Sequence, residues 1–100
     1  MEEDLMTIAV MTVILYTPMC HDLKCKRRIV KSTKDKLSGH FNVSVAECDY
    51  HEDYHRALIG IAMIGSDARY LEAKIQTVIN FLEKTVTVDF DIVEQTIEKW

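Results

Sequence analysis

The features that most constrain the fold are two strands without a polar face. Leu5 to Tyr16 is apolar at nearly every position, with Thr7 and Thr12 as the interruptions. Such a run is typical of a strand that is covered on both faces. Arg56 to Gly65 has the same character, with Gly60 in its middle. We therefore expect both segments to lie in the centre of a sheet.

A helix is predicted after the first strand, which Thr17-Pro18 ends. Asp22 can accept backbone hydrogen bonds as the N-cap of a helix that begins at Leu23, and Gly39 suits its C-terminal end. The side chains on one side of this helix are mostly apolar: Leu23, Ile29, Val30, Thr33 and Leu37. Its basic residues fall mostly on the other side.

A second helix and two half-buried strands complete the pattern. Ser66 or Asp67 can cap the helix, which should end near Thr85. Its apolar residues recur at helical spacing: Leu71, Ile75, Val78, Ile79 and Leu82. Asn42 to Tyr50 and Val86 to Ile92 alternate between apolar and polar residues, which predicts strands with one buried face. The last six residues receive no assignment.

The resulting order, β-α-β-β-α-β, predicts an α+β fold of the ferredoxin-like type. In this fold two right-handed βαβ units form one four-stranded antiparallel sheet with both helices on one face. One hundred residues suffice for a single domain with its own core. We therefore expect one domain over residues 1–100, with a core at about 5–94 and a short C-terminal tail.

The sheet face away from the helices should have an apolar centre and a polar rim. The two central strands lack a polar face, whereas the outer strands keep one. This is the composition of a protein interface, so a homodimer contact is predicted there. The alternative is that the tail beyond Gln95 folds over this face.

Charge is strongly segregated along the chain. Seven of the twelve Lys and Arg residues lie between Lys24 and Lys36, with Asp35 as the one acid among them. The rest of the chain holds five basic and fifteen acidic residues. So basic a helix can attract phosphate or an acidic surface. The candidate anion-binding residues are Lys24, Lys26, Arg27, Arg28, Lys31 and Lys34.

Composition argues for a cytoplasmic protein. The longest apolar run is too short to span a bilayer, and the leader Glu2-Glu3-Asp4 is acidic rather than basic. No membrane anchor is expected. Three cysteines without a framework spacing favour a reducing compartment over a disulfide scaffold.

One further pattern is spread over several stretches of the chain: Leu23-Lys24-x-Lys26-Arg27, Val30-Lys31, the run from Phe41 to Asp49, Arg56-Ala57 and Gly60. Together these stretches resemble the YlxP-like family of small bacterial proteins. The resemblance spans residues 5–94 and implies a ferredoxin-like fold, a bacterial cytosolic setting and no established activity. Family members often lie among genes for translation factors and ribosome maturation, which implies an RNA-linked role.

The chain departs from the family pattern at three places. Cys25 stands where an acidic residue is usual, and Asp22 replaces the usual Ser cap. Tyr54-His55 replaces a usual Trp-Gln pair and creates an HExxH motif from His51 to His55. A zinc protease needs both His on one helical turn and a third ligand downstream. The pentad instead joins two short strands, which argues against a zinc protease. Metal binding by His51, His55 and Asp49 without protease activity is kept as an alternative to a site without metal.

The cysteines are interpreted as structural. Met19-Cys20 and Cys25 resemble the loop of small copper chaperones, where thiolates suit Cu(I). That loop needs two residues between the cysteines, and here four intervene, so no metal is assigned to Cys20 and Cys25. Cys48 should pack as a small apolar group.

The family-motif residues Glu47, Asp49 and Arg56 form the last candidate group. Glu47 and Asp49 should share the face of Val43 and Val45 and meet the basic helix or Arg56 in an ion-pair network. The functional alternative is that Glu47 acts as a general base while Arg56 beside it binds an anion. No nucleophile, phosphate loop or cofactor motif completes such a site.

These observations predict a non-enzymatic protein without a cofactor, whose basic helix binds RNA or a ribosome-associated partner. Stacking of bases on the sheet is disfavoured, because the one aromatic residue of the two central strands is Tyr16, at the end of the first. Two alternatives stay open. One is a metal-binding or hydrolytic protein using His51 and His55, and the other is a structural or regulatory dimerisation module.

Overall fold

The computed structural model describes residues 6–100. Its elements are β1 (Thr7–Tyr16), α1 (Leu23–His40), β2 (Ser44–Asp49), β3 (Arg56–Gly65), α2 (Ala68–Thr85) and β4 (Phe90–Lys99). This order confirms the predicted α+β, ferredoxin-like arrangement. The bounds of the third strand are those expected from the sequence, and the predicted start of the first strand at Leu5 lies outside the described residues.

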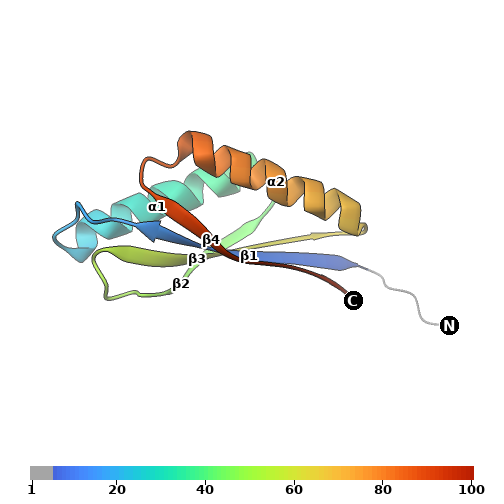
Figure 1. The fold of residues 1–100 in the computed structure, drawn as a ribbon, viewed down its shortest axis with the longest axis horizontal. Coiled ribbons are helices and arrows are strands. Elements are labelled where there is room, and N and C mark those ends of the chain that lie inside the picture. Colours follow the sequence, from blue (N-terminus) through green and yellow to red (C-terminus); the bar gives the residue numbers. More distant parts are fainter. Residues whose placement is uncertain (1–5) are drawn as a thin grey trace.

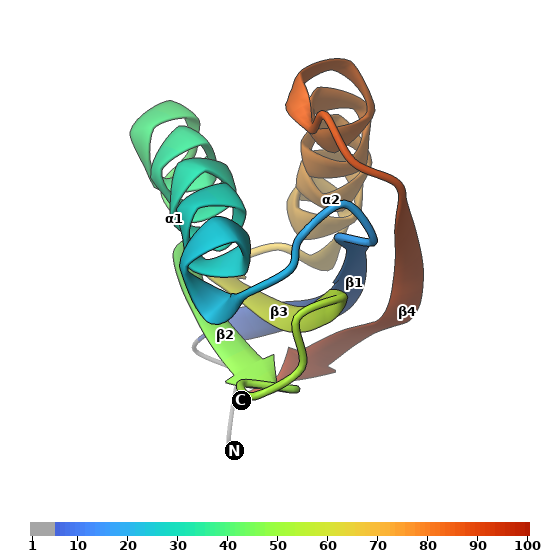
Figure 2. The ribbon, with the colours of Figure 1, turned by 90° about the vertical axis from the view of Figure 1, so that its left-hand side faces the viewer.

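One antiparallel sheet carries both helices on the same face (Figure 1). Its strand order is β2-β3-β1-β4, so the two strands without a polar face are central, as predicted. Figure 2 shows α1 above β2 and β3, and α2 above the half of the sheet that holds β1 and β4. In the described part of the chain, neither helix is long and apolar enough to cross a membrane.

The core lies between the sheet and the helices. Every second residue of the central strands points into it, because side chains alternate across a strand. The buried strand residues are Ala9, Met11, Val13, Leu15, Ala57, Ile59, Ile61 and Met63. Each helix adds four buried residues: Lys26, Val30, Thr33 and Leu37 from α1, and Leu71, Ile75, Val78 and Leu82 from α2.

Aspartate side chains cap both helices. The Asp22 carboxylate accepts the backbone N–H of Cys25 at 2.8 Å, and that of Asp67 accepts the N–H of Arg69 at 2.9 Å. Asp67 rather than Ser66 is therefore the second cap. The first helix continues past Gly39 to His40, so the expected C-terminal role of this glycine is wrong.

The last strand begins later and runs further than the alternation predicted. It pairs with β1 from Phe90, opposite Leu15, to Lys99, opposite Thr7. Val86 to Val88 do not pair with β1, because the N–H of Val86 closes the helix on Leu82 and β1 ends at Tyr16, whose N–H donates to the carbonyl oxygen of Asp89 at 2.9 Å. The tail is thus an edge strand, and the alternative that it covers the open sheet face is wrong.

Candidate nucleic-acid interface

The outward side of α1 carries a row of basic side chains, which we call the basic stripe: Lys24, Arg27, Arg28 and Lys31. Their spacing of three and four residues places them on one side of the helix, opposite the buried Val30. All four are exposed, and they span about 10 Å of helix at 1.5 Å per residue. Lys34 extends the stripe and is half-buried.

Most of the basic stripe has no internal counter-charge. Lys31 pairs with Asp35 at 2.6 Å, but both side chains are well exposed, so solvent screens this pair. Among the described residues, no carboxylate lies within ion-pair distance of Lys24, Arg27 or Arg28. These three cations are therefore free to meet an external anion.

Lys26 does not belong to this surface, although the sequence suggested it. Its side chain is fully buried, and its Nζ donates to the carbonyl oxygens of Tyr50 at 2.7 Å, His51 at 3.3 Å and Arg56 at 3.3 Å. The reason is helical spacing, since residue 26 lies four residues before the buried Val30. Lys26 thus ties the start of α1 to the turn between β2 and β3.

Glu47 supplies the charge that balances Lys26. Its Oε2 lies 3.1 Å from the Lys26 Nζ, and the Glu47 side chain is only 16% exposed. This oxygen accepts no hydrogen bond of good geometry from the described residues, so the ammonium group is its compensation. The expected link between Glu47 and the basic helix is present, but it is a buried structural pair.

The other two family-motif residues lie apart from Glu47. The register of β2 against β3 shifts between Glu47 and Asp49, so Asp49 pairs with Leu58 on the opposite face of the sheet. The prediction that Glu47 and Asp49 share a face is therefore wrong. Arg56 pairs instead with Asp53 at 2.8 Å and lies 3.9 Å over the ring of Tyr50.

The turn between β2 and β3 is shaped by contacts that the sequence did not reveal. The N–H of His55 and the Arg56 side chain, both bonded to the Asp53 carboxylate, lower the pKa of Asp53. The hydrogen bond that Arg56 donates to the Asp53 carboxylate in turn raises the pKa of Arg56. Tyr50 adopts φ 64°, a left-handed conformation that is unusual for a residue other than glycine. Its carbonyl is the closest acceptor of Lys26.

The histidines of the HExxH pentad lie in this same turn and not on a helix. The Nε2 of His51 is 3.2 Å from the carbonyl oxygen of Glu47, so this ring faces its own hairpin. Within residues 6–100, no three His, Cys, Asp or Glu side chains are arranged to hold a metal ion. The geometry that a zinc protease requires is therefore not formed by His51 and His55.

Cys20 and Cys25 form a disulfide, whereas the number and spacing of the cysteines had favoured a reducing compartment over a disulfide scaffold. Their Cα atoms are 5.5 Å apart, within the usual range for such a bond. Four intervening residues can bring the sulfurs together because the chain turns back at the helix N-cap. The bond anchors the first turn of α1 beside Lys24. Cys48 is the free cysteine of the described chain and is exposed rather than packed.

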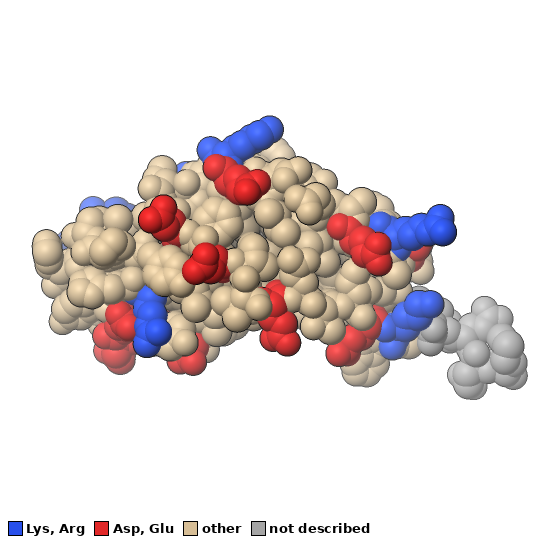
Figure 3. All heavy atoms as spheres, in the orientation of Figure 1, with Lys and Arg blue, Asp and Glu red and all other residues tan. Residues whose placement is uncertain are grey.

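The edge of the molecule formed by β4 is acidic. Figure 3 shows the side formed by α2 and β4, where Asp and Glu side chains are spread across the surface and Lys and Arg side chains lie mainly at its margins. Exposed acidic residues lie on β4 and immediately before it: Asp89, Asp91, Glu94 and Glu98. Asp91 accepts the hydroxyl of Tyr16 at 2.7 Å, and this bond raises the pKa of Tyr16. The charge segregation of the sequence is thus a segregation in space.

Comparisons with known proteins agree with the resemblance found in the sequence. Residues 8–97 match the model of a family described as "Protein of unknown function (DUF503)". The chain is 31% identical over 77 residues to the uncharacterized protein YlxP of Bacillus subtilis (strain 168), which covers 77% of this chain and 78% of that protein. The residues matched by the family model include nearly every strand and helix described above. The chain therefore belongs to the DUF503 family of proteins of unknown function, with YlxP as a relative.

Proposed function

We propose that this protein is a non-enzymatic cytoplasmic binding protein that contacts the phosphate backbone of RNA, free or in a ribosome-associated particle, through the basic stripe. The observation that supports the proposal is the row of exposed cations on α1, of which Lys24, Arg27 and Arg28 have no carboxylate of residues 6–100 within ion-pair distance. Exposed charges that serve solubility alone are normally mixed in sign. On α1 the outward charges are almost all positive.

The open sheet face favours this mode over the stacking of bases. Sheet-based RNA recognition uses aromatic side chains on the central strands. Here those positions carry aliphatic or small residues, such as Val10, Gly60 and Ala62, and Tyr16 is already bonded to Asp91. Binding should therefore read the shape of a folded RNA and not its sequence.

The charge polarity of the molecule supports an oriented approach. The acidic edge at β4 repels the phosphate backbone, whereas the α1 side attracts it. Lys26 takes no part, since burial removes it from any ligand. With about four phosphate contacts, the logarithm of the affinity should fall with the logarithm of salt concentration at a slope of about −3.

Charge reversal on α1 tests the proposal. We expect Arg27→Glu, Arg28→Glu and Lys31→Glu together to weaken binding of a labelled structured RNA by more than about tenfold in low-salt fluorescence anisotropy. They should also abolish co-sedimentation with bacterial ribosomes. The fold should survive, because all three side chains are exposed.

A matched variant controls for the change in net charge. Arg69→Glu, Lys74→Glu and Lys84→Glu reverse three basic residues of α2 and alter the total charge by the same amount. This variant should keep binding close to that of the parent protein. Equal affinities for the two triple variants would overturn the proposal, because binding would then depend on overall charge and not on the basic stripe.

A further inference from the structure

The open face of the sheet exposes apolar side chains that the remainder of residues 6–100 does not cover. Val10 is 43% exposed and Ile64 is 56% exposed, although both belong to central strands. Around them lie Ile8, Ile14, Leu58 and Ala62 on the same face. Because the C-terminal residues pair as β4 at the edge, they leave this face open.

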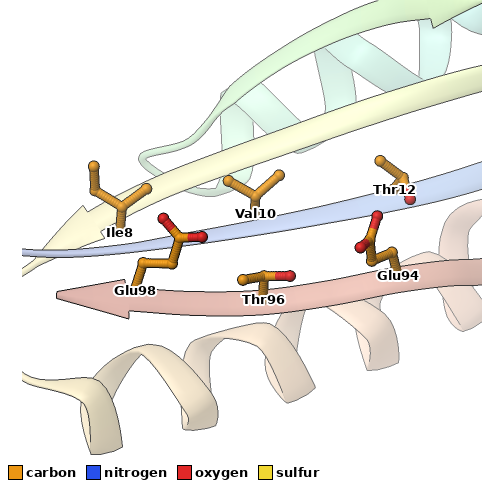
Figure 4. Close-up of a pocket in the computed structure, with 6 residues that line it drawn as sticks. All are labelled: Ile8, Val10, Thr12, Glu94, Thr96 and Glu98. Atoms are coloured by element: carbon orange, nitrogen blue, oxygen red, sulfur yellow. The ribbon is translucent and has the colours of Figure 1, made fainter.

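The shape of this face is self-complementary, because it has both a ridge and hollows. Figure 4 shows Val10 beside a hollow of about 230 Å³ between β1 and β4, lined by Thr12, Glu94, Thr96 and Glu98. A second hollow of about 280 Å³ lies on the other side of Val10, over Gly60, Ala62 and Ala46. The row of Ile8 and Val10 on β1 is therefore a ridge, and the small residues of β3 and β2 form a groove next to it.

We propose that the open face binds a second copy of this chain, about a two-fold axis that runs parallel to the strands. Four strands about 4.8 Å apart and up to ten residues long cover about 600 Å² per copy. Two copies would then bury about 1,200 Å² in total, which reaches the range of stable protein interfaces. The inference is independent of RNA binding.

The ridge and the groove determine the direction of the two-fold axis. A two-fold axis parallel to the strands and between β1 and β3 places β1 of one copy over β3 of the other. Val10 of the ridge then lies over Ala62 of the other copy, in the groove that continues to Gly60. An axis across the strands would place ridge on ridge and leave both grooves empty.

The charges select the same axis. On the open face, β4 carries Asp91, Glu94 and Glu98, whereas β2 carries the neutral Ser44 and Ala46 and, at its end, one acid, Asp49. An axis parallel to the strands brings β4 over β2 of the other copy, where Glu94 faces the neutral Ala46 and Asp91 is the one acid that faces another acid, Asp49. The alternative axis would bring β4 over β4, and like charges at an interface cost several kcal/mol. In the proposed dimer both helices stay on the outer faces, so both basic stripes remain accessible.

Sedimentation analysis tests the assembly. We expect twice the chain mass of 11.6 kDa at micromolar concentration for the parent protein, and a monomer for Val10→Lys. Lysine at this site buries a charge in the dimer but lies diagonally beside Glu94 and Glu98 within one copy, so the fold should persist. Ile64→Lys, at a more exposed site, is the second variant, and Ala73→Lys on the exposed side of α2 is the control that should stay dimeric. A monomeric parent, or variants as dimeric as the control, would refute the interface.

Cross-linking tests the axis. In the proposed dimer, Cys48 on β2 faces β4 of the other copy, whereas Cys20 and Cys25 are held in their disulfide. We expect a short bis-maleimide to link Glu94→Cys dimers only while Cys48 is present. Linking that persists after Cys48→Ser would indicate β4 over β4, and no linking in either background would equally contradict the proposed geometry.

Discussion

The two helices have the same length and the same Asp cap, yet they are held to the sheet by different forces. Both bury residues at four equivalent positions, counted from the cap. In α2 all four are apolar: Leu71, Ile75, Val78 and Leu82. In α1, Lys26 and Thr33 take the places of Leu71 and Val78. Hydrophobic packing therefore anchors α2, whereas α1 depends in part on polar bonds to the turn between β2 and β3.

This difference matters because α1 is the helix that carries the basic stripe. Cations crowd its outer side, and a buried ion pair with three carbonyl bonds orients its first turn. A charged group inside a protein must be fully paired to be tolerated. The comparison teaches that the position of the candidate interface depends on Lys26, even though Lys26 cannot touch a ligand.

The largest expected effect separates the two helices at equivalent sites. Lys26→Met keeps the length of the side chain but leaves Glu47 and three carbonyls without their partner. We expect it to lower the free energy of unfolding by about 3–5 kcal/mol in urea denaturation. Leu71→Met at the matching position of α2 should cost less than about 1.5 kcal/mol. Equal losses of unfolding free energy in the two variants would contradict the view that polar bonds anchor α1 and apolar packing anchors α2.

A smaller effect concerns the disulfide, which only α1 possesses. Reduction of the bond between Cys20 and Cys25 releases a six-residue loop, so a thiol reductant should lower the free energy of unfolding by about 2 kcal/mol. Denaturation with and without reductant measures the difference. Cys48→Ser is the control, and the effect of the reductant on the free energy of unfolding should be the same in this variant as in the parent protein. If reductant has no effect on the parent protein, the disulfide does not contribute to the anchoring of α1.

The smallest effect compares the two caps. Asp67→Ala should cost about 1 kcal/mol, the usual value for loss of an N-cap. Asp22→Ala should cost less while the disulfide is intact, because the covalent bond already holds the residues around the N-terminus of α1. Under reductant the two losses should become similar. A larger loss at Asp22 in the oxidised protein would contradict this account.

Local patterns were enough to predict the order of the elements. The caps Asp22 and Asp67 and the bounds of β3 agree with the structure, because capping and alternation act over a few neighbouring residues. The burial of Lys26 could have been inferred as well, since it shares the spacing of Val30 and Leu37. Its charge argued against burial, and its partner Glu47 is distant in sequence.

Other features depend on contacts between distant segments. The register shift that turns Asp49 away from Glu47 occurs in the pairing of two strands, and no local pattern marks it. The true extent of β4 is decided by where β1 ends. The partner of Arg56 is Asp53 in the adjoining turn, although the alternation of the strand had suggested Asp49 or Glu47.

The sequence by itself determined the fold class, the two central strands and the presence of a strongly basic helix. Each of these follows from hydrophobic spacing and charge along one segment of chain. Tertiary structure alone decided which lysine is buried, which cysteines meet and which cations remain without a counter-charge. The physical reason is that pairing depends on the approach of groups that lie far apart in the chain.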